Sequence, residues 1–280
     1  MVFFPDILKV GKITPIYKKG NPQLLDNYRP VSVIPIFAKN FEKVIYRRLH
    51  SFFSATKIIY DKQFGFRKNH STSHAVNYSI NHILNEIESK NHVIGIFIDL
   101  SKAFDTIDHK KLLDKLENYG IRVVCYNLLK SYLTNRTQIT DFQKTESDVC
   151  FVEYGVPQGS VLWPLLFLVY INDMINCTSC NNCNELLNCT DCKNCLKFGN
   201  FVLFADDTNI FVSGKNEKEA YKNANKVLSD VYNYMVINQL HINMEKSVHM
   251  HFRPSLNVQE RLTCARVREY GSGNVLNLGN

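Results

Sequence analysis

Residues 201–212 read FVLFADDTNIFV, two apolar runs separated by a pair of aspartates. Each run has the length and the aromatic and β-branched content of a strand, and two strands joined by two residues predict a hairpin. The predicted strands are residues 201–205 and 208–212, with Asp206 and Asp207 at the tip. Because a hairpin this tight requires antiparallel pairing, the sequence predicts an antiparallel sheet at this point.

Another carboxylate, that of Asp99, follows a second strand-like segment. Residues 93–98 (VIGIFI) form a short apolar run of the kind found in buried strands, and Asp99 comes directly after it. Two oxygen-rich strand ends could together hold a pair of Mg²⁺ ions, which take carboxylate ligands and leave positions open for phosphate oxygens. Such a pair activates an attacking hydroxyl and stabilises a leaving pyrophosphate. Taken singly, however, an aspartate after a strand more often ends the strand or forms part of a turn than binds a metal.

Helical and strand patterns alternate irregularly over the rest of the chain. Apolar periodicity predicts helices at residues 36–53, 71–88, 108–119, 121–133, 160–174 and 216–237. Further strands are predicted at residues 12–17, 147–153 and 246–252. Irregular alternation of this kind, together with the hairpin, predicts an α+β fold. Residues 253–280 carry no periodic pattern and are left as an unassigned tail.

Charge is distributed unevenly along the chain, whose formal net charge is +7. Residues 1–70 contain 13 Lys or Arg against four Asp or Glu, whereas the remaining residues contain 20 against 22. A basic front and a carboxylate-bearing back fit a polyanionic partner that is held at one end and acted on at the other. A solvated basic helix surface explains the charge equally well. Because the apolar runs are too short for a membrane span and no signal peptide is recognisable, we expect an intracellular protein with no membrane partner.

Six short motifs occur in order along the chain. They are NYRPVS (27–32), QFGFR (63–67), FIDLSKAFD (97–105), GVPQGS (155–160), FADD (204–207) and NQLHIN (238–243) followed by Lys246. Together they resemble the motifs of reverse transcriptases, specifically those of LINE-type, non-LTR retrotransposons of the jockey-like kind. The first two resemble fingers motifs, the next three resemble palm motifs, and the last resembles the motif that follows the catalytic hairpin. The resemblance extends over residues 5–252.

The resemblance implies the fingers and palm of a right-hand polymerase. The fingers would occupy residues 1–92, which are basic and begin inside that region, and the palm would occupy residues 93–252 as an antiparallel sheet backed by helices. Nothing after residue 252 resembles a thumb, and nothing resembles the endonuclease that usually precedes this domain. The expected activity is RNA-directed DNA polymerisation, in which deoxynucleotides are added to a primer 3′-hydroxyl.

The same resemblance implies partners, cofactors and site residues. The partners would be an RNA template, a DNA primer and deoxynucleoside triphosphates, and the location would be the nucleus. Asp99, Asp206 and Asp207 would be the catalytic carboxylates and would hold two Mg²⁺ ions, for which Mn²⁺ can substitute. Phe104 would reject a 2′-hydroxyl by its volume, unless it is an ordinary core residue. The residues expected to contact the nucleotide are Lys18, Arg29, Phe104, Gln158, Gly159 and Lys246.

One residue departs from the family pattern. Trp163 stands where the family usually has Gly or Ser. A side chain this large must find a cavity or displace its helix, at a cost of about 1–3 kcal/mol. Because Trp163 closely follows Gln158, template placement could suffer. With the missing thumb, this supports an alternative, namely a catalytically inactive truncated remnant that still binds nucleic acid through its basic front.

A cysteine-rich insert, residues 177–195, precedes the predicted catalytic hairpin. Its octets NCTSCNNC (176–183) and NCTDCKNC (188–195) share six of eight residues. Paired Cys-x2-Cys units have the spacing of a tetrahedral Zn²⁺ site, so a zinc-binding interaction module is a further alternative. A duplicated loop without a metal explains the pattern equally well. The candidate zinc ligands are Cys177, Cys180, Cys183, Cys189, Cys192 and Cys195.

Overall fold

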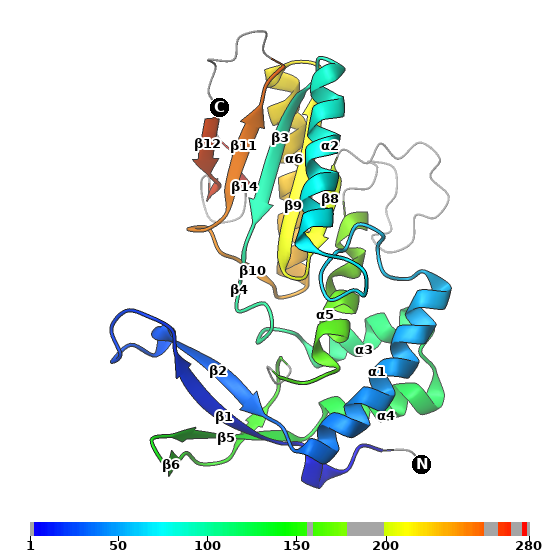
Figure 1. The fold of residues 1–280 in the computed structure, drawn as a ribbon, viewed down its shortest axis with the longest axis vertical. Coiled ribbons are helices and arrows are strands. Elements are labelled where there is room, and N and C mark those ends of the chain that lie inside the picture. Colours follow the sequence, from blue (N-terminus) through cyan, green and yellow to red (C-terminus); the bar gives the residue numbers. More distant parts are fainter. Residues whose placement is uncertain (1–2, 156–158, 178–198, 255–262, 270–275, 279–280) are drawn as a thin grey trace. The chain divides into compact units, whose positions relative to one another are not determined.

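The computed structural model describes residues 3–155, 159–177, 199–254, 263–269 and 276–278. These residues form two compact units (Figure 1). The first unit comprises Met1–Ile59 and Phe104–Ile171, and the second unit comprises Tyr60–Ala103 and Asn172–Asn280. Each unit therefore joins two stretches that are far apart in the sequence.

A mixed sheet organises part of the first unit. Strand β1 (Val10–Tyr17) pairs antiparallel with β2 (Tyr28–Val33) on one side and parallel with β5 (Arg136–Phe142) on the other. The short strands β6 (Thr145–Glu146) and β7 (Cys150–Val152) pair antiparallel with β5. Two 3-10 turns, η1 (Asp6–Leu8) and η2 (Leu25–Asn27), precede β1 and β2. The strand predicted at 12–17 is confirmed, β7 is shorter than the predicted 147–153, and β5 is a strand that the sequence pattern did not predict.

The described part of the first unit contains the helices α1 (Ile36–Thr56), α3 (His109–Asn118), α4 (Val123–Leu133) and α5 (Trp163–Ile171). Local chemistry fixes the ends of α3: the Asp108 carboxylate accepts hydrogen bonds from two backbone N–H groups at its start, and Gly120 follows its end at φ +95°. Eight of the nine residues of α5 are buried, as its apolar sequence predicts. This helix begins later than the predicted residue 160, because Pro164 has no N–H to donate and is tolerated only in a first turn.

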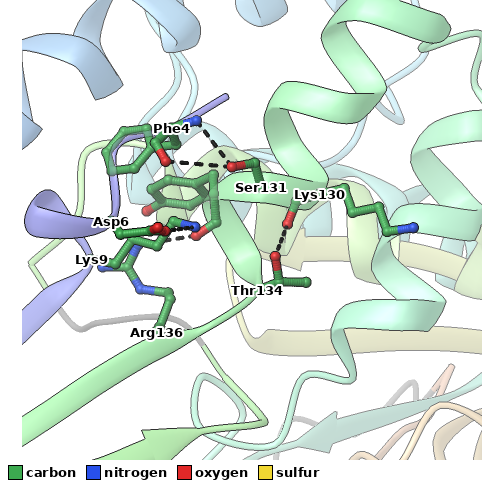
Figure 2. A network of polar contacts seen from close by, with 8 residues as sticks. Phe4, Asp6, Lys9, Lys130, Ser131, Thr134 and Arg136 are labelled. Atoms are coloured by element: carbon green, nitrogen blue, oxygen red, sulfur yellow. Dashed lines mark hydrogen bonds and ion pairs between the residues drawn. The ribbon is translucent and has the colours of Figure 1, made fainter. Parts of the chain in front are cut away.

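The N-terminal segment is attached to α4 by a small network of polar contacts (Figure 2). The buried Phe4 donates its N–H to Ser131 Oγ at 3.0 Å, and the Ser131 hydroxyl donates to the Phe4 carbonyl at 3.4 Å. The Phe4 ring also meets Tyr132 edge-on, with ring centroids 5.0 Å apart. Lys9, whose side chain is only 4% exposed, pairs with Asp6 at 2.7 Å. These contacts fix the chain immediately before β1.

An antiparallel sheet is the centre of the second unit, with strands in the order β12–β11–β3–β9–β8. These strands are β12 (Thr263–Arg266), β11 (Val248–Phe252), β3 (His92–Ile98), β9 (Asp207–Gly214) and β8 (Asn200–Phe204). Helix α2 (Thr72–Glu88) covers one face of the sheet and α6 (Glu217–Ile237) covers the other (Figure 1). On the α2 face, Ala75 packs with Val93, Val202 and Phe211. This sheet backed by helices confirms the predicted α+β class.

Smaller elements complete the second unit. Strand β4 (Leu100–Ser101) pairs with β10 (His241–Ile242), and β13 (Arg268–Glu269) pairs with β14 (Leu276–Asn277). The 3-10 helix η3 (Asn172–Asn176) follows α5 directly in the chain. The tail that the sequence left unassigned contributes a strand, because β12 pairs with β11 at the edge of the sheet. In the parts of the chain that the structure describes, no helix is long and apolar enough to cross a membrane.

Candidate active site

The β8–β9 hairpin presents two aspartates at one end of the second unit's sheet. Phe204 pairs with Asp207, so the connecting loop consists of Ala205 and Asp206. The predicted loop of Asp206 and Asp207 was therefore one residue too late, and Asp207 is the first residue of β9. Ala205 adopts φ +56°, a left-handed conformation that costs a residue with a Cβ about 1–2 kcal/mol.

Asp99 lies at the end of the neighbouring strand, as the sequence predicts. β3 pairs antiparallel with β9, and its last residue, Ile98, is opposite Thr208. The Asp99 N–H donates to Ser247 Oγ at 3.2 Å, and its carbonyl accepts from the Asn243 N–H at 2.8 Å. The segment after α6, which carries the last of the six motifs, thus fixes the backbone that carries this carboxylate.

Asp99, Asp206 and Asp207, here termed the carboxylate cluster, influence one another electrostatically. Burial raises the pKa of Asp206, and the charges of Asp207 and Asp99 raise it further. Burial also raises the pKa of Asp207, with a contribution from the charge of Asp99. Lys246 opposes both shifts. Its Nζ lies 3.4 Å from Asp99 Oδ2.

The carboxylate cluster supplies the type of donor atom that a hard divalent cation prefers. Asp99 Oδ2 is buried, and although the Lys246 ammonium lies 3.4 Å away, it makes no hydrogen bond among the described residues, so a metal could take it as a ligand. Among those residues, no three His, Cys, Asp or Glu side chains are grouped closely enough to hold an ion as they stand. The cluster therefore has the oxygen ligands that Mg²⁺ prefers in an open arrangement, with an ammonium at one carboxylate.

A cavity of about 340 Å³ opens beside the carboxylate cluster within the second unit. Asp99, Asp207 and Lys246 line its polar side. Phe97 and Val76 contribute to its apolar side, from β3 and α2 respectively. The cluster thus borders a space that can admit a ligand, rather than a closed core.

Two of the predicted nucleotide contacts, Lys18 and Arg29, belong to the β1–β2 hairpin of the first unit. Arg29 is opposite Ile16 in the register, and the Lys18 N–H donates to the Asn27 carbonyl at 2.8 Å just beyond the paired residues. Both side chains are exposed. The hairpin therefore brings these two cations to one end of a two-stranded ribbon.

Phe104, the predicted sugar gate, packs against α5 within the first unit. Its ring meets Trp163 edge-on at 5.3 Å between centroids and lies 4.9 Å from the ring of Phe167. Trp163 is only 5% exposed. The large side chain at position 163 therefore occupies a buried site next to Phe104, the first of the two outcomes that the sequence left open.

Close backbone approach explains the two glycines that flank residues 156–158. Gly155 has φ +72°, and a Cβ there would lie 2.8 Å from the Asp105 backbone. Gly159 has φ +121°, and a Cβ there would lie 2.7 Å from the Ser32 carbonyl oxygen. Any other residue would be strained and would collide with backbone. Gln158, which was predicted to contact the nucleotide, lies between these two glycines in the sequence and is outside the described residues.

Glu42, a buried carboxylate that sequence reasoning missed, holds the segment that directly follows Gly159. Glu42 of α1 is fully buried and accepts hydrogen bonds from the Tyr132 hydroxyl (2.8 Å), the Ser160 hydroxyl (3.0 Å) and the Val161 N–H (2.7 Å). Its place between Ala38 and Ile45 on the apolar face of α1 was the available signal, because an acidic residue on a buried stripe must find donors.

The cysteine-rich insert falls almost wholly outside the described residues. This applies to Cys180, Cys183, Cys189, Cys192 and Cys195. Cys177 is described and half-buried, and burial raises the pKa of its thiol. The zinc hypothesis therefore stays a prediction from spacing.

Comparison with known sequences identifies similar polymerases. The family described as "Reverse transcriptase (RNA-dependent DNA polymerase)" matches residues 16–276. The RNA-directed DNA polymerase from the mobile element jockey of Drosophila melanogaster is 31% identical over 251 residues, which cover 89% of this chain and 26% of the relative. The probable RNA-directed DNA polymerase from transposon BS of the same species is 35% identical over 173 residues, 61% of this chain and 19% of the relative. The chain thus spans about a fifth to a quarter of these relatives.

Solved structures of telomerase share the fold. Apo telomerase from Candida tropicalis, truncated from its C-terminal domain, matches with a TM-score of 0.59 at 15% identity, over 93% of this chain and 53% of that chain. Telomerase from Candida albicans in complex with a TWJ fragment of telomeric RNA matches with a TM-score of 0.58 at 13% identity, over 96% of this chain and 45% of that chain. At this identity the likeness establishes the fold alone.

Proposed function

This chain belongs to the reverse transcriptase (RNA-dependent DNA polymerase) family, and from that premise we propose that it adds deoxynucleotides to a primer 3′-hydroxyl at its carboxylate cluster. The observation that carries the proposal is the placement of Asp99, Asp206 and Asp207. They lie at the ends of two adjacent strands, beside a cavity, and their burial and repulsion raise the pKa of Asp206 and Asp207. Such clustering of perturbed carboxylates is a mark of a reactive site rather than of a turn.

In this proposal the three carboxylates hold two Mg²⁺ ions, or Mn²⁺ in their place. When bound, such ions stabilise the charge of the attacking and leaving oxygens in phosphoryl transfer. The chain's own residues supply the rest. Lys246 neutralises part of the cluster's charge, and the hydrogen bonds of Asp99 to Ser247 and Asn243 keep its carboxylate at the end of β3.

The remaining proposed contacts recognise the nucleotide. Lys18 and Arg29 would bind its phosphates as exposed cations, with Gln158 and Gly159 near the base and template. Phe104 would exclude a 2′-hydroxyl, because its ring is backed by Trp163 and has little freedom to retreat. The expected partners are an RNA template, a DNA primer and deoxynucleoside triphosphates, and the expected location is the nucleus. In this proposal residues 1–92 are the fingers, and residues 93–252, which include the carboxylate cluster, are the palm.

Primer extension tests the proposal directly. The chain is incubated with an RNA template, a DNA primer and one deoxynucleoside triphosphate, with and without Mg²⁺. The parent chain should add one nucleotide, and Asp206→Asn should add none while binding the same template–primer. Asp61→Asn is the matched control, because Asp61 is an exposed aspartate of the same unit. Extension by Asp206→Asn at the parental rate would refute the assignment, and RNA binding without extension by the parent would favour the inactive remnant.

Zinc at the insert is a separate proposal that rests on the spacing of Cys177–Cys195 alone. Elemental analysis of the purified chain should give about one Zn²⁺ per molecule, and changing Cys180, Cys183, Cys189 and Cys192 together to Ser should abolish it, because two thiolates cannot complete a tetrahedral site. A metal-free parent chain would leave the duplicated-loop interpretation.

A further inference from the structure

The segment before α2 lies along the edge of the catalytic hairpin. The Leu203 N–H donates to the Lys62 carbonyl at 3.0 Å, and the Phe64 N–H donates to the Leu203 carbonyl at 2.7 Å. Gln63 and Leu203 thereby form an isolated parallel bridge. Residues 62–64 thus extend the sheet beyond β8, next to the loop that carries Asp206.

The Gln63 side chain reaches that loop. It is only 2% exposed, and its Oε1 accepts the Ala205 N–H at 3.0 Å and the Gly65 N–H at 2.8 Å. Its Nε2 lies 3.5 Å from the Ala205 carbonyl oxygen, a weaker contact. Because two N–H donors face Oε1, the orientation of the side-chain amide follows from its partners. One side chain therefore meets both backbone polar groups of the left-handed residue in the loop.

Gly65 allows this close approach. A Cβ on Gly65 would lie 2.1 Å from the Ala205 nitrogen and 2.8 Å from its Cα, both backbone atoms that cannot move away cheaply. Residue 65 therefore has to be glycine for the QFGFR segment to contact the hairpin in this way. Gln63 and Gly65, two residues apart in this motif, therefore both contact Ala205.

We propose that Gln63 is a positioning residue for nucleotidyl transfer. By binding both sides of Ala205 it holds the loop in the left-handed conformation that directs Asp206 and Asp207 towards Asp99. This inference rests on the proposed function, since it concerns the same carboxylates. A packing role alone would not explain why residue 63 is glutamine. Burying an amide costs more free energy than burying an apolar side chain of equal volume, unless the hydrogen bonds of the amide are needed.

The test compares Gln63→Met, which keeps the volume and removes the acceptor, with Gln63→Glu, which keeps two acceptor oxygens. Val231→Ala, a fully buried change in α6, is the control for general destabilisation. Hydrogen exchange over residues 200–210 reports on the Ala205 amide, and Mn²⁺ titration followed by electron paramagnetic resonance reports on the cluster. Single-turnover nucleotide addition gives the rate and the KM for the nucleotide.

Gln63→Met should exchange faster at Ala205, bind Mn²⁺ about 10- to 100-fold more weakly and lose a similar factor in rate, with KM little changed. Gln63→Glu should keep the slow exchange. Mn²⁺ affinity and rate that fall no further in Gln63→Met than in Val231→Ala would overturn the inference. A parent chain that binds no Mn²⁺ would instead contradict the proposed function, and the exchange of Ala205 would still decide whether Gln63 holds the loop.

Discussion

Lys246 Nζ lies 3.4 Å from Asp99 Oδ2, which places an ammonium at the carboxylate cluster. Burial raises the pKa of Asp206 and Asp207, the charge of Asp99 raises both further, and the charge of Lys246 lowers both. Because the Lys246 side chain is 69% exposed, it can leave Asp99 without disturbing the core. In the proposed function, Lys246 would therefore be a counter-charge that a cation or a substrate phosphate could replace.

Removing this ammonium should shift the cluster's titration. In Lys246→Met the pKa of Asp206 and Asp207 rises further, so the carboxylates stay protonated to a higher pH and bind metal less readily. The acid limb of Mn²⁺ binding, measured from about pH 4 to pH 8, should therefore move to higher pH. Lys215→Met, at an exposed lysine after β9, is the control. An acid limb at the same pH in both variants would show that Lys246 does not influence the cluster.

The carboxylate cluster should also cost stability. The pKa of Asp206 is raised in the folded state, so the folded chain binds the proton more tightly than the unfolded chain, and stability falls as pH rises through the folded pKa. At neutral pH, Asp206→Asn should raise the Tm by about 1–3 °C, a small gain because Asp206 is partly exposed. Mg²⁺ should raise the Tm of the parent more than that of the variant. A lower Tm for Asp206→Asn would contradict this electrostatic account.

Trp163 should stabilise the first unit rather than strain it. Because its buried ring packs on Phe104 and Phe167, Trp163→Gly should lower the free energy of unfolding by about 3–5 kcal/mol. It should also reduce the preference for deoxynucleotides over ribonucleotides, since Phe104 loses the ring behind it. Trp163→Phe, which keeps a ring, should retain most of both properties. A more stable Trp163→Gly chain with unchanged selectivity would show that tryptophan overpacks this site.

Glu42 should be a structural requirement for the segment after Gly159. Glu42→Ala leaves the donors of Tyr132, Ser160 and Val161 without their acceptor, at a cost of about 1–3 kcal/mol for a buried group left unsatisfied. Glu42→Gln keeps one acceptor oxygen and should cost less. Urea unfolding measures both changes. Equal midpoints for the parent and Glu42→Ala would mean that water satisfies these donors.

The sequence predicted the elements whose signal is local. The apolar run before Asp99, the paired strands around Asp206 and the cap of α3 at Asp108 each depend on residues within one element. Elements that depend on a distant partner were missed. β5 (RTQITDF) is largely polar and becomes a strand by pairing in parallel with β1, and β12 forms because β11 offers an open edge. Neither pairing leaves a periodic pattern in the sequence.

In the candidate site too, the features with a local signal could be predicted and those that depend on distant residues could not. The three aspartates could be named in advance because acidic residues after strands, in order with other motifs, resemble a known site. The position of the loop could not be predicted, because alanine rarely adopts the positive φ that Ala205 has, and Asp206–Asp207 looked like the better turn. Gln63 holds Ala205 from more than a hundred residues away, a contact that only the folded chain reveals.

The most direct test of the central claim is single-nucleotide addition by Asp99→Asn, measured beside its affinity for template–primer. Asp99 carries a buried oxygen that makes no hydrogen bond among the described residues and faces only the Lys246 ammonium, so the substitution removes the charge of a proposed metal ligand and leaves the backbone contacts of β3 in place. The account predicts unchanged template–primer binding and no Mg²⁺-dependent addition. Addition at the parental rate would contradict it.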